Sequence, residues 1–233
     1  MADTVRYELR DDVAIVTLDD GKANALSRAV IAAVDAALDR AEGEAKAVVL
    51  AGRPGRFSGG FDLGVMGGGG GRQAVIDLVS AGGELALRLY EFPRPTVAAC
   101  TGHAIAMGAF LVLACDLRVG ADGDFKIGLN EVANGMTVPI FGVELARERL
   151  SKRHLTRAVA TSEIYAPAAA VDAGFFDTIT APERVVDEAH TTAKRLTALV
   201  PGAFARTRAR LRQATISHVR STLAADMLEL TGG

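Results

Sequence analysis

The sequence has no tryptophan, only two cysteines, and aromatic residues at just 5% of its positions. Cys100 and Cys115 each lie within an apolar run without CxxC or metal-ligand spacing, which predicts two buried free thiols rather than a disulfide or a zinc site. No apolar stretch approaches the length of a membrane span, and the N-terminus lacks the pattern of a secretory signal. These absences predict a protein of the reducing cytoplasm.

An excess of charge of one sign is also lacking. The 26 basic and 28 acidic side chains give a net charge of −2. The chain therefore lacks the net positive charge that is typical of proteins that bind nucleic acid. Local lysine and arginine side chains still suit a polyanionic small molecule. With 233 residues, 49% of them hydrophobic, the chain is long enough to bury one substantial core.

Apolar runs that alternate with helical periodicity predict an α/β fold. The runs at 13–18, 47–51 and 96–100 predict buried parallel strands, and shorter strands are expected at 117–119, 124–127 and 175–180. Helical periodicity predicts helices at 27–42, 73–91, 107–114, 143–150, 154–160 and 168–173.

Glycine and proline mark the expected interruptions. The low-complexity run from Gly67 to Gly71 predicts a loop, and Gly82-Gly83 is expected to break or bend the helix at 73–91. Beyond Pro182 only helical signals remain, at 185–199 and 203–230. We therefore expect a first unit at 1–181 and a helical C-terminal region at 182–233.

Two short segments predict the two halves of an oxyanion hole: Phe57-Ser58-Gly59-Gly60-Phe61-Asp62-Leu63 and Gly102-His103-Ala104-Ile105-Ala106-Met107-Gly108. Each is a small-residue turn after an apolar run, so backbone N–H groups from both can converge on one carbonyl oxygen. The second turn opens an apolar helix, whose first amides lack intrahelical partners. Glu131 is the carboxylate expected beside them. A lone Gly-Gly is more often a tight connection, and an isolated glutamate more often a surface charge.

Taken together, these motifs resemble the crotonase, or enoyl-CoA hydratase/isomerase, superfamily from about Val13 to Val200. Residues 22–26 resemble its nucleotide-contacting segment, 57–63 and 102–116 its two oxyanion turns, and 129–139 its catalytic-carboxylate segment. The resemblance implies a crotonase-like ββα spiral core at 1–181 that binds acyl-CoA, followed by a helical oligomerisation region.

The resemblance also implies a role for each residue of the site. Glu131 is the catalytic base, and the amides of Gly59 and Met107 form the oxyanion hole. Met107 replaces the usual glycine, which is tolerated if its side chain points away. Lys22 fits a solvated turn equally well, and Asp62 fits an anchor of its own turn. The implied substrate-binding residues are Lys22, Ala23, Ser58, Gly60, Phe61, Asp62 and Phe110.

The reaction implied is proton transfer next to a thioester carbonyl. Coenzyme A enters as part of the substrate, so neither a separate cofactor nor a metal is expected. Phe110 stands where family hydratases carry a second glutamate, so a double-bond shift by Glu131 alone is the leading expectation. The two alternatives are an enoyl-CoA hydratase, which is a lyase, of fatty acid β-oxidation and a non-catalytic acyl-CoA-binding protein.

The resemblance further implies a homotrimer, or a hexamer of paired trimers, with the C-terminal helices in the contact. The spacing of Leu223, Met227 and Leu230 gives this assembly partial support, although the same apolar stripe also fits an intramolecular core.

Overall fold

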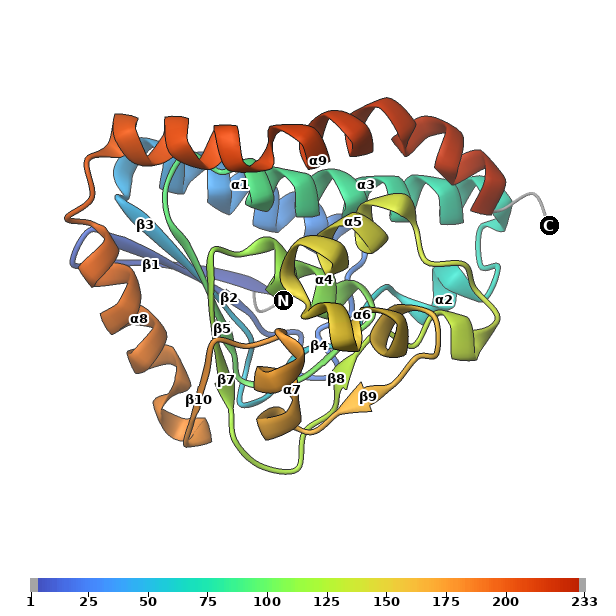
Figure 1. Ribbon diagram of the computed structural model, residues 1–233, viewed down its shortest axis with the longest axis horizontal. Coiled ribbons are helices and arrows are strands. Elements are labelled where there is room, and N and C mark those ends of the chain that lie inside the picture. The colour runs from blue at the N-terminus through green and yellow to red at the C-terminus, as the bar shows by residue number, and fades with distance from the viewer. Residues whose placement is uncertain (1–3, 231–233) are drawn as a thin grey trace.

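The structure is a computed structural model that describes residues 4–230, apart from the side chain of Leu230. It has an α/β architecture with two sheets and a long C-terminal helix (Figure 1). Along residues 4–230, no helix combines the length and the apolar character that a membrane span requires.

The larger sheet has six strands in the order β1-β2-β3-β5-β7-β10. β1 pairs antiparallel with β2, and every other pairing in this sheet is parallel. The predicted strands at 13–18, 47–51 and 96–100 are confirmed. The strand bounds are Val5–Arg10, Val13–Leu18, Ala47–Ala51, Thr96–Cys100, Leu117–Ala121 and Thr178–Thr180, for β1, β2, β3, β5, β7 and β10.

Both faces of this sheet are covered, which explains why its central strands are apolar at nearly every position. One face packs on α8 (Val185–Leu196) through Val185, Ala189 and Ala193. The other face packs on α1 (Arg28–Glu44), α3 (Gly71–Glu91) and α4 (Met107–Ala114). The predicted buried thiols are confirmed: Cys100 and Cys115 are free, and burial raises the pKa of each to about 12.

A second, smaller sheet has four strands in the order β4-β6-β8-β9. They are β4 (Gly55–Ser58), β6 (Gly102–Ile105), β8 (Ile127–Gly128) and β9 (Ile164–Tyr165). β4, β6 and β8 run parallel, whereas β9 is antiparallel to β8. The sequence predicted turns at 57–63 and 102–108, but residues 57–58 of the first motif and 102–105 of the second belong to strands.

The expected break at Gly82-Gly83 is wrong, because α3 continues unbroken through both residues. A Cβ atom at Gly82 would lie 2.5 Å from Cε1 of Phe61, and one at Gly83 would lie 2.9 Å from Cδ1 of Phe141. The two glycines therefore let aromatic rings pack against the helix. The Gly67–Gly71 run forms a turn between the short helix α2 (Leu63–Met66) and the start of α3, as predicted.

Of the remaining helices, α5, α6 and α7 lie on the side of the smaller sheet, and α9 runs along α3 (Figure 1). The two helices after Pro182 both pack on earlier elements, α8 on the larger sheet and α9 along α3 and α5. The bounds are η1 Val132–Asn134, α5 Ile140–Arg149, α6 Lys152–Val159, α7 Pro167–Ala173, η2 Pro182–Arg184 and α9 Pro201–Leu230.

Buried ion pairs anchor α9 to the core. Arg208 and Arg212 both donate to Oδ1 of Asp116 at 2.8 Å, and their remaining N–H groups donate to backbone carbonyls at the end of α3. Further along the helix, Leu223 and Met227 are only 8% and 2% exposed within the single chain. This part of the apolar stripe is therefore intramolecular core and gives no support to an oligomer contact. The side chain of Leu230 lies outside the described residues.

Candidate active site

The three segments that carry the predicted site follow three neighbouring parallel strands. β4 leads into residues 59–62, β6 into Ala106 and Met107, and β8 into Leu129, Asn130 and Glu131. The carboxyl ends of parallel strands meet at one edge of a sheet, which is where ligands bind in many α/β folds. Segments far apart in the sequence are thus brought to one place by the smaller sheet.

Among residues 59–62 of the first turn motif, one backbone N–H group has no acceptor within the described part of the chain. Gly59 N donates to Ala23 O at 2.8 Å, Gly60 N to Ser58 Oγ at 3.1 Å, and Asp62 N to Leu26 O at 3.2 Å. The N–H of Phe61 donates to no acceptor within residues 4–230. The prediction that Gly59 supplies an oxyanion donor is therefore wrong, because its hydrogen is already bound, and the free donor is two residues later.

In the second turn motif, Met107 provides a free amide at the start of α4. Its N–H has no partner among the described residues, as expected for the first residue of a helix. Ala106, just before it, has φ of 52° and ψ of −125°, and its own N–H donates to Gly128 O at 3.0 Å. A non-glycine residue in this strained conformation is typical of sites where function fixes the backbone.

The two motifs meet in space. A Cβ atom at Gly60 would lie 3.1 Å from Cβ of Ala106 and 3.5 Å from the backbone nitrogen of Met107. The Met107 side chain packs inward toward Gly82 and is 1% exposed, so it points away from the turn, as the sequence required. The amides of Phe61 and Met107 therefore lie on adjoining segments, at the positive end of the α4 dipole.

Glu131 is buried next to these amides. Its side chain is 7% exposed, and within the described part of the chain its Oε2 atom has no hydrogen-bond partner. Burial raises the pKa of Glu131 to about 7, against the smaller effect of a hydrogen bond from its own backbone N–H. A carboxylate that titrates near neutral pH is well matched to general base catalysis.

A cavity of about 470 Å³ lies over the site and opens to solvent. Of the predicted site residues, Gly59, Phe61, Phe110 and Glu131 line it. Its other walls come from α2, α3, the loop before α5, and the end of α9. They are formed by Leu63, Met66, Val75, Ile76, Val79, Ala106, Asn130, Asn134, Gly135, Met136, Thr137, Pro139, Phe141, Met227 and Glu229.

Two predicted substrate contacts have structural roles instead. Ser58 is fully buried, and its hydroxyl group donates to Asn24 O at 2.8 Å, so the prediction that it lines the groove is wrong. The Asp62 carboxylate accepts a hydrogen bond from Gly64 N at 2.8 Å and caps α2, which confirms the alternative that it anchors its own turn. Lys22 and Ala23 are exposed beside the first motif, and their contact with a nucleotide stays a prediction.

Phe110 occupies the inner wall of the cavity. Its side chain is 1% exposed, and its ring meets Phe141 edge-on with a centroid distance of 5.6 Å. A Cβ atom at Gly142 would lie 2.5 Å from Cζ of Phe110, so the ring fits against a position that only glycine leaves open. The place of the absent second carboxylate is therefore filled by packed apolar atoms.

Asn24 organises the first motif and was missed by sequence reasoning. It is 2% exposed with φ of 51°, and its amide nitrogen lies 2.9 Å from Leu18 O, 3.1 Å from Arg56 O and 3.1 Å from Phe57 O. These interactions fix the 19–26 loop against β4, which places Ala23 O on the Gly59 amide. An asparagine in a polar turn gives no sequence signal for such a role.

Comparison with known proteins identifies the family. A family model described as enoyl-CoA hydratase/isomerase matches residues 8–230. The chain is 41% identical to a solved enoyl-CoA hydratase/isomerase family protein of Pseudomonas syringae, with a TM-score of 0.95 over 98% of this chain and 99% of that one. It is 40% identical to a Mycobacterium tuberculosis protein described as an enoyl-CoA isomerase, solved in the apo form, with a TM-score of 0.92 over 97% of this chain and 100% of that one. A second structure of the same protein describes it as a probable enoyl-CoA hydratase.

A human relative extends the match beyond bacteria. Human mitochondrial enoyl-CoA delta isomerase 1 is 29% identical over 221 residues, which cover 92% of this chain and 72% of the relative. These matches span nearly the whole chain and include the segments that build the site. The chain therefore belongs to the enoyl-CoA hydratase/isomerase family of the crotonase superfamily.

Proposed function

We propose that this protein shifts the double bond of an enoyl-CoA thioester from the 3 to the 2 position. The observation that carries the proposal is Glu131, a buried carboxyl group with a pKa raised to about 7 and one oxygen that has no partner among the described residues. It lines the same cavity as Phe61, whose amide has no acceptor within residues 4–230. This combination suits a single base that takes a proton and returns it.

In the proposed mechanism, the thioester oxygen accepts hydrogen bonds from the N–H groups of Phe61 and Met107. Ionised Glu131 removes a proton from carbon 2, and the electron pair moves onto the carbonyl oxygen as a dienolate. The same carboxyl group then delivers the proton to carbon 4, leaving the double bond between carbons 2 and 3. Each oxyanion donor is expected to stabilise the transition state by roughly 2.7–4 kcal/mol.

Phe110 favours isomerisation over hydration. Adding water across a double bond requires that a water molecule be held and a proton be delivered, and the family hydratases share this work between two glutamates. The Phe110 ring offers neither a proton nor a lone pair. The cavity lining does include a second carboxylate, Glu229, but this side chain is exposed at the end of α9 rather than at the position of Phe110.

The names of the relatives support an acyl-CoA substrate. Proteins named enoyl-CoA isomerase and others named enoyl-CoA hydratase both match this chain, so the names do not choose between the two reactions. We propose that coenzyme A enters only as part of the thioester. Two backbone dipoles and one carboxylate supply the electrostatic and the acid-base parts of the reaction, so no further cofactor is required.

A direct test compares the wild-type enzyme with Glu131→Gln on two substrates, 3-hexenoyl-CoA and 2-hexenoyl-CoA. We expect wild-type enzyme to convert the first into the second without forming a 3-hydroxyacyl product. Loss of a general base commonly lowers the rate by about 10²–10⁴-fold, so kcat of Glu131→Gln should fall within that range while substrate still binds.

The matched control is Glu183→Gln, the same change at an exposed glutamate of η2 far from the cavity. It should leave kcat unchanged. Hydration of 2-hexenoyl-CoA as the sole activity would establish the hydratase instead. Binding of both thioesters without turnover, unaffected by Glu131→Gln, would establish a non-catalytic acyl-CoA-binding protein.

A further inference from the structure

A buried carboxylate near the end of α9 joins that helix to the start of α5. Asp226 is 7% exposed, and its Oδ2 atom accepts a hydrogen bond from the backbone N–H of Ile140 at 2.7 Å. Ile140 is the first residue of α5, and Pro139 before it provides no side-chain cap. Asp226 therefore supplies from another helix the negative cap that favours a helix N-terminus.

The residues on both sides of this hydrogen bond line the cavity over Glu131. Pro139 and Phe141 flank Ile140 and line it from α5, while Met227 and Glu229 follow Asp226 and line it from α9. The Asp226 carboxylate itself is not part of the lining. The hydrogen bond thus joins the α5 wall of the cavity to the α9 wall, on the side away from the cavity. We call this hydrogen bond the α5–α9 clasp.

The wall that the clasp holds is apolar. Met227 is 2% exposed, and Phe141 is 1% exposed against Gly83 of α3. Together with Val75, Ile76 and Val79 of α3 they line a side of the cavity whose chemistry differs from that of Asn130, Glu131 and Asn134. An aliphatic tail leaving the reacting carbons is expected to lie against this wall, because burial of apolar surface there is favourable.

The base is held independently of the clasp. The backbone N–H groups of Asn134 and Met136 donate to Glu131 O at 3.0 and 2.9 Å, which closes the loop after β8 on itself. Loss of the clasp should therefore release the end of α9 without moving Glu131. The effect should grow with the length of the acyl tail.

We propose that Asp226 is a positioning residue that fixes the end of α9 as the wall for the acyl tail, so that its loss weakens binding of acyl chains long enough to reach that wall. This inference rests on the proposed function only in taking an acyl-CoA as the ligand. Without the clasp, a smaller fraction of the protein has the wall in the conformation that binds the acyl tail. The apparent affinity for ligands that touch this wall is therefore weaker.

Calorimetric binding of two saturated thioesters, butyryl-CoA and dodecanoyl-CoA, tests the proposal without relying on turnover. For Asp226→Ala we expect affinity for dodecanoyl-CoA to fall roughly fivefold to tenfold, the range for loss of one capping hydrogen bond. Affinity for butyryl-CoA should change less than about twofold, because four carbons do not reach the α9 wall.

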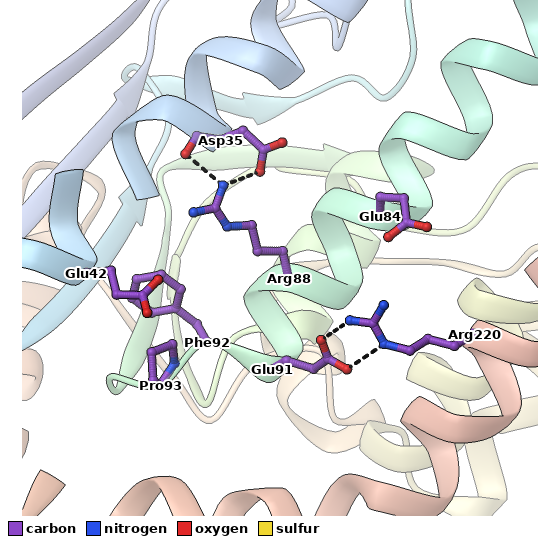
Figure 2. A pocket seen from close by; sticks show the side chains of 8 residues that line it. All are labelled: Asp35, Glu42, Glu84, Arg88, Glu91, Phe92, Pro93 and Arg220. Carbon is purple, nitrogen blue, oxygen red and sulfur yellow. Dashed lines mark hydrogen bonds and ion pairs between the residues drawn. The ribbon is translucent and has the colours of Figure 1, made fainter. Parts of the chain in front are cut away.

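Arg220→Gln is the matched control, because it removes an ion pair between α9 and Glu91 of α3 at a distance from the cavity lining (Figure 2). It should leave both affinities unchanged. Asp226→Asn keeps an oxygen that can accept from Ile140 N but loses the charge, so an intermediate loss of dodecanoyl-CoA affinity is expected. This variant carries the test if Asp226→Ala does not fold.

The outcomes separate the two proposals. Equal losses for both thioesters in Asp226→Ala and in Asp226→Asn would mean that the carboxylate is merely structural, and would overturn the inference. Unchanged affinities in both variants would overturn it as well. If the wild-type protein binds neither thioester, the proposed acyl-CoA function fails, and this inference fails with it.

Discussion

Two hollows in this molecule differ in whether their charged side chains form ion pairs. The first, of about 380 Å³, lies between α1, α3 and α9, and its charged side chains are largely paired (Figure 2). Arg88 donates to Asp35 at 2.8 Å, and Arg220 donates to Glu91 at 3.0 Å. The second is the cavity over the site, where the walls are mostly apolar and Glu131 Oε2 has no partner among the described residues.

This difference indicates which of the two hollows is the candidate active site. Exposed ion pairs fix one helix against another at little net gain in stability, typically about 0–1 kcal/mol. A buried carboxyl group without a partner destabilises the fold when it ionises, and it persists where a reaction uses it. The hollow with more charge is therefore structural, and the hollow that holds a buried carboxyl group without a partner among the described residues is the candidate site.

The largest effect expected on stability comes from removing that carboxyl group. Between the ordinary pKa of 4.5 and its folded value of about 7, Glu131 keeps its proton in the folded chain and loses it in the unfolded chain. The folded state then binds more protons, so wild-type stability falls as pH rises through this window. Glu131→Gln should raise the free energy of unfolding by up to about 3 kcal/mol at pH 8.

The same substitution should have little such effect near pH 4.5, where the folded chain is protonated at this position and the unfolded chain is about half protonated. Urea unfolding of both proteins at pH 4.5 and pH 8 measures the difference. An equal effect of Glu131→Gln at the two pH values would show that Glu131 is not perturbed, and the contrast between the two hollows would be lost.

A smaller effect is expected from Gly82→Ala, which disturbs the packing of the site without touching a charge. The added methyl group would meet the Phe61 ring, so we expect the free energy of unfolding to fall by about 1–3 kcal/mol and kcat/KM to fall as the Phe61 amide shifts. Gly43→Ala in α1 is the control, because nothing lies within 4 Å of its Cβ position. That change should stabilise the chain by about 0.5–1 kcal/mol.

The smallest effect is expected in the paired-charge hollow. Arg220→Gln removes its ion pair with Glu91, whose partners are 55% and 26% exposed. The free energy of unfolding should fall by less than about 1 kcal/mol, and less still at high salt, while kcat stays unchanged. A loss of activity without loss of stability would place function in this hollow and reverse the comparison.

The sequence predicted the central strands of the larger sheet because they are continuous apolar runs, whereas the half-exposed β1 at Val5–Arg10 was missed. Ala47–Ala51 and Thr96–Cys100 are buried on both faces, and no local alternative competes with a parallel strand there. In the smaller sheet, β4 and β6 were missed because Gly55–Ser58 and Gly102–Ile105 are short and begin with glycine. Their strand character comes from pairing with each other, which no local pattern reveals.

The sequence predicted the segments that form the candidate site, but it did not predict every donor atom. Glu131 and Met107 stand where the motifs placed them, and their catalytic roles stay predictions. Gly59 was taken as a donor because glycine exposes its amide, yet the carbonyl group of Ala23 from a distant loop already accepts that hydrogen. Which N–H group stays unpaired depends on tertiary contacts such as this one. The structure was therefore needed to identify the Phe61 amide as the donor.

The pH dependence of kcat/KM for 3-hexenoyl-CoA tests the central claim most directly. If Glu131 is the one base and titrates near 7, kcat/KM should fall about tenfold per unit as pH decreases below about 7, since only the ionised form removes a proton. The limb should be absent from the residual activity of Glu131→Gln. A profile that stays flat from pH 5 to pH 8 in the wild-type enzyme would contradict the account.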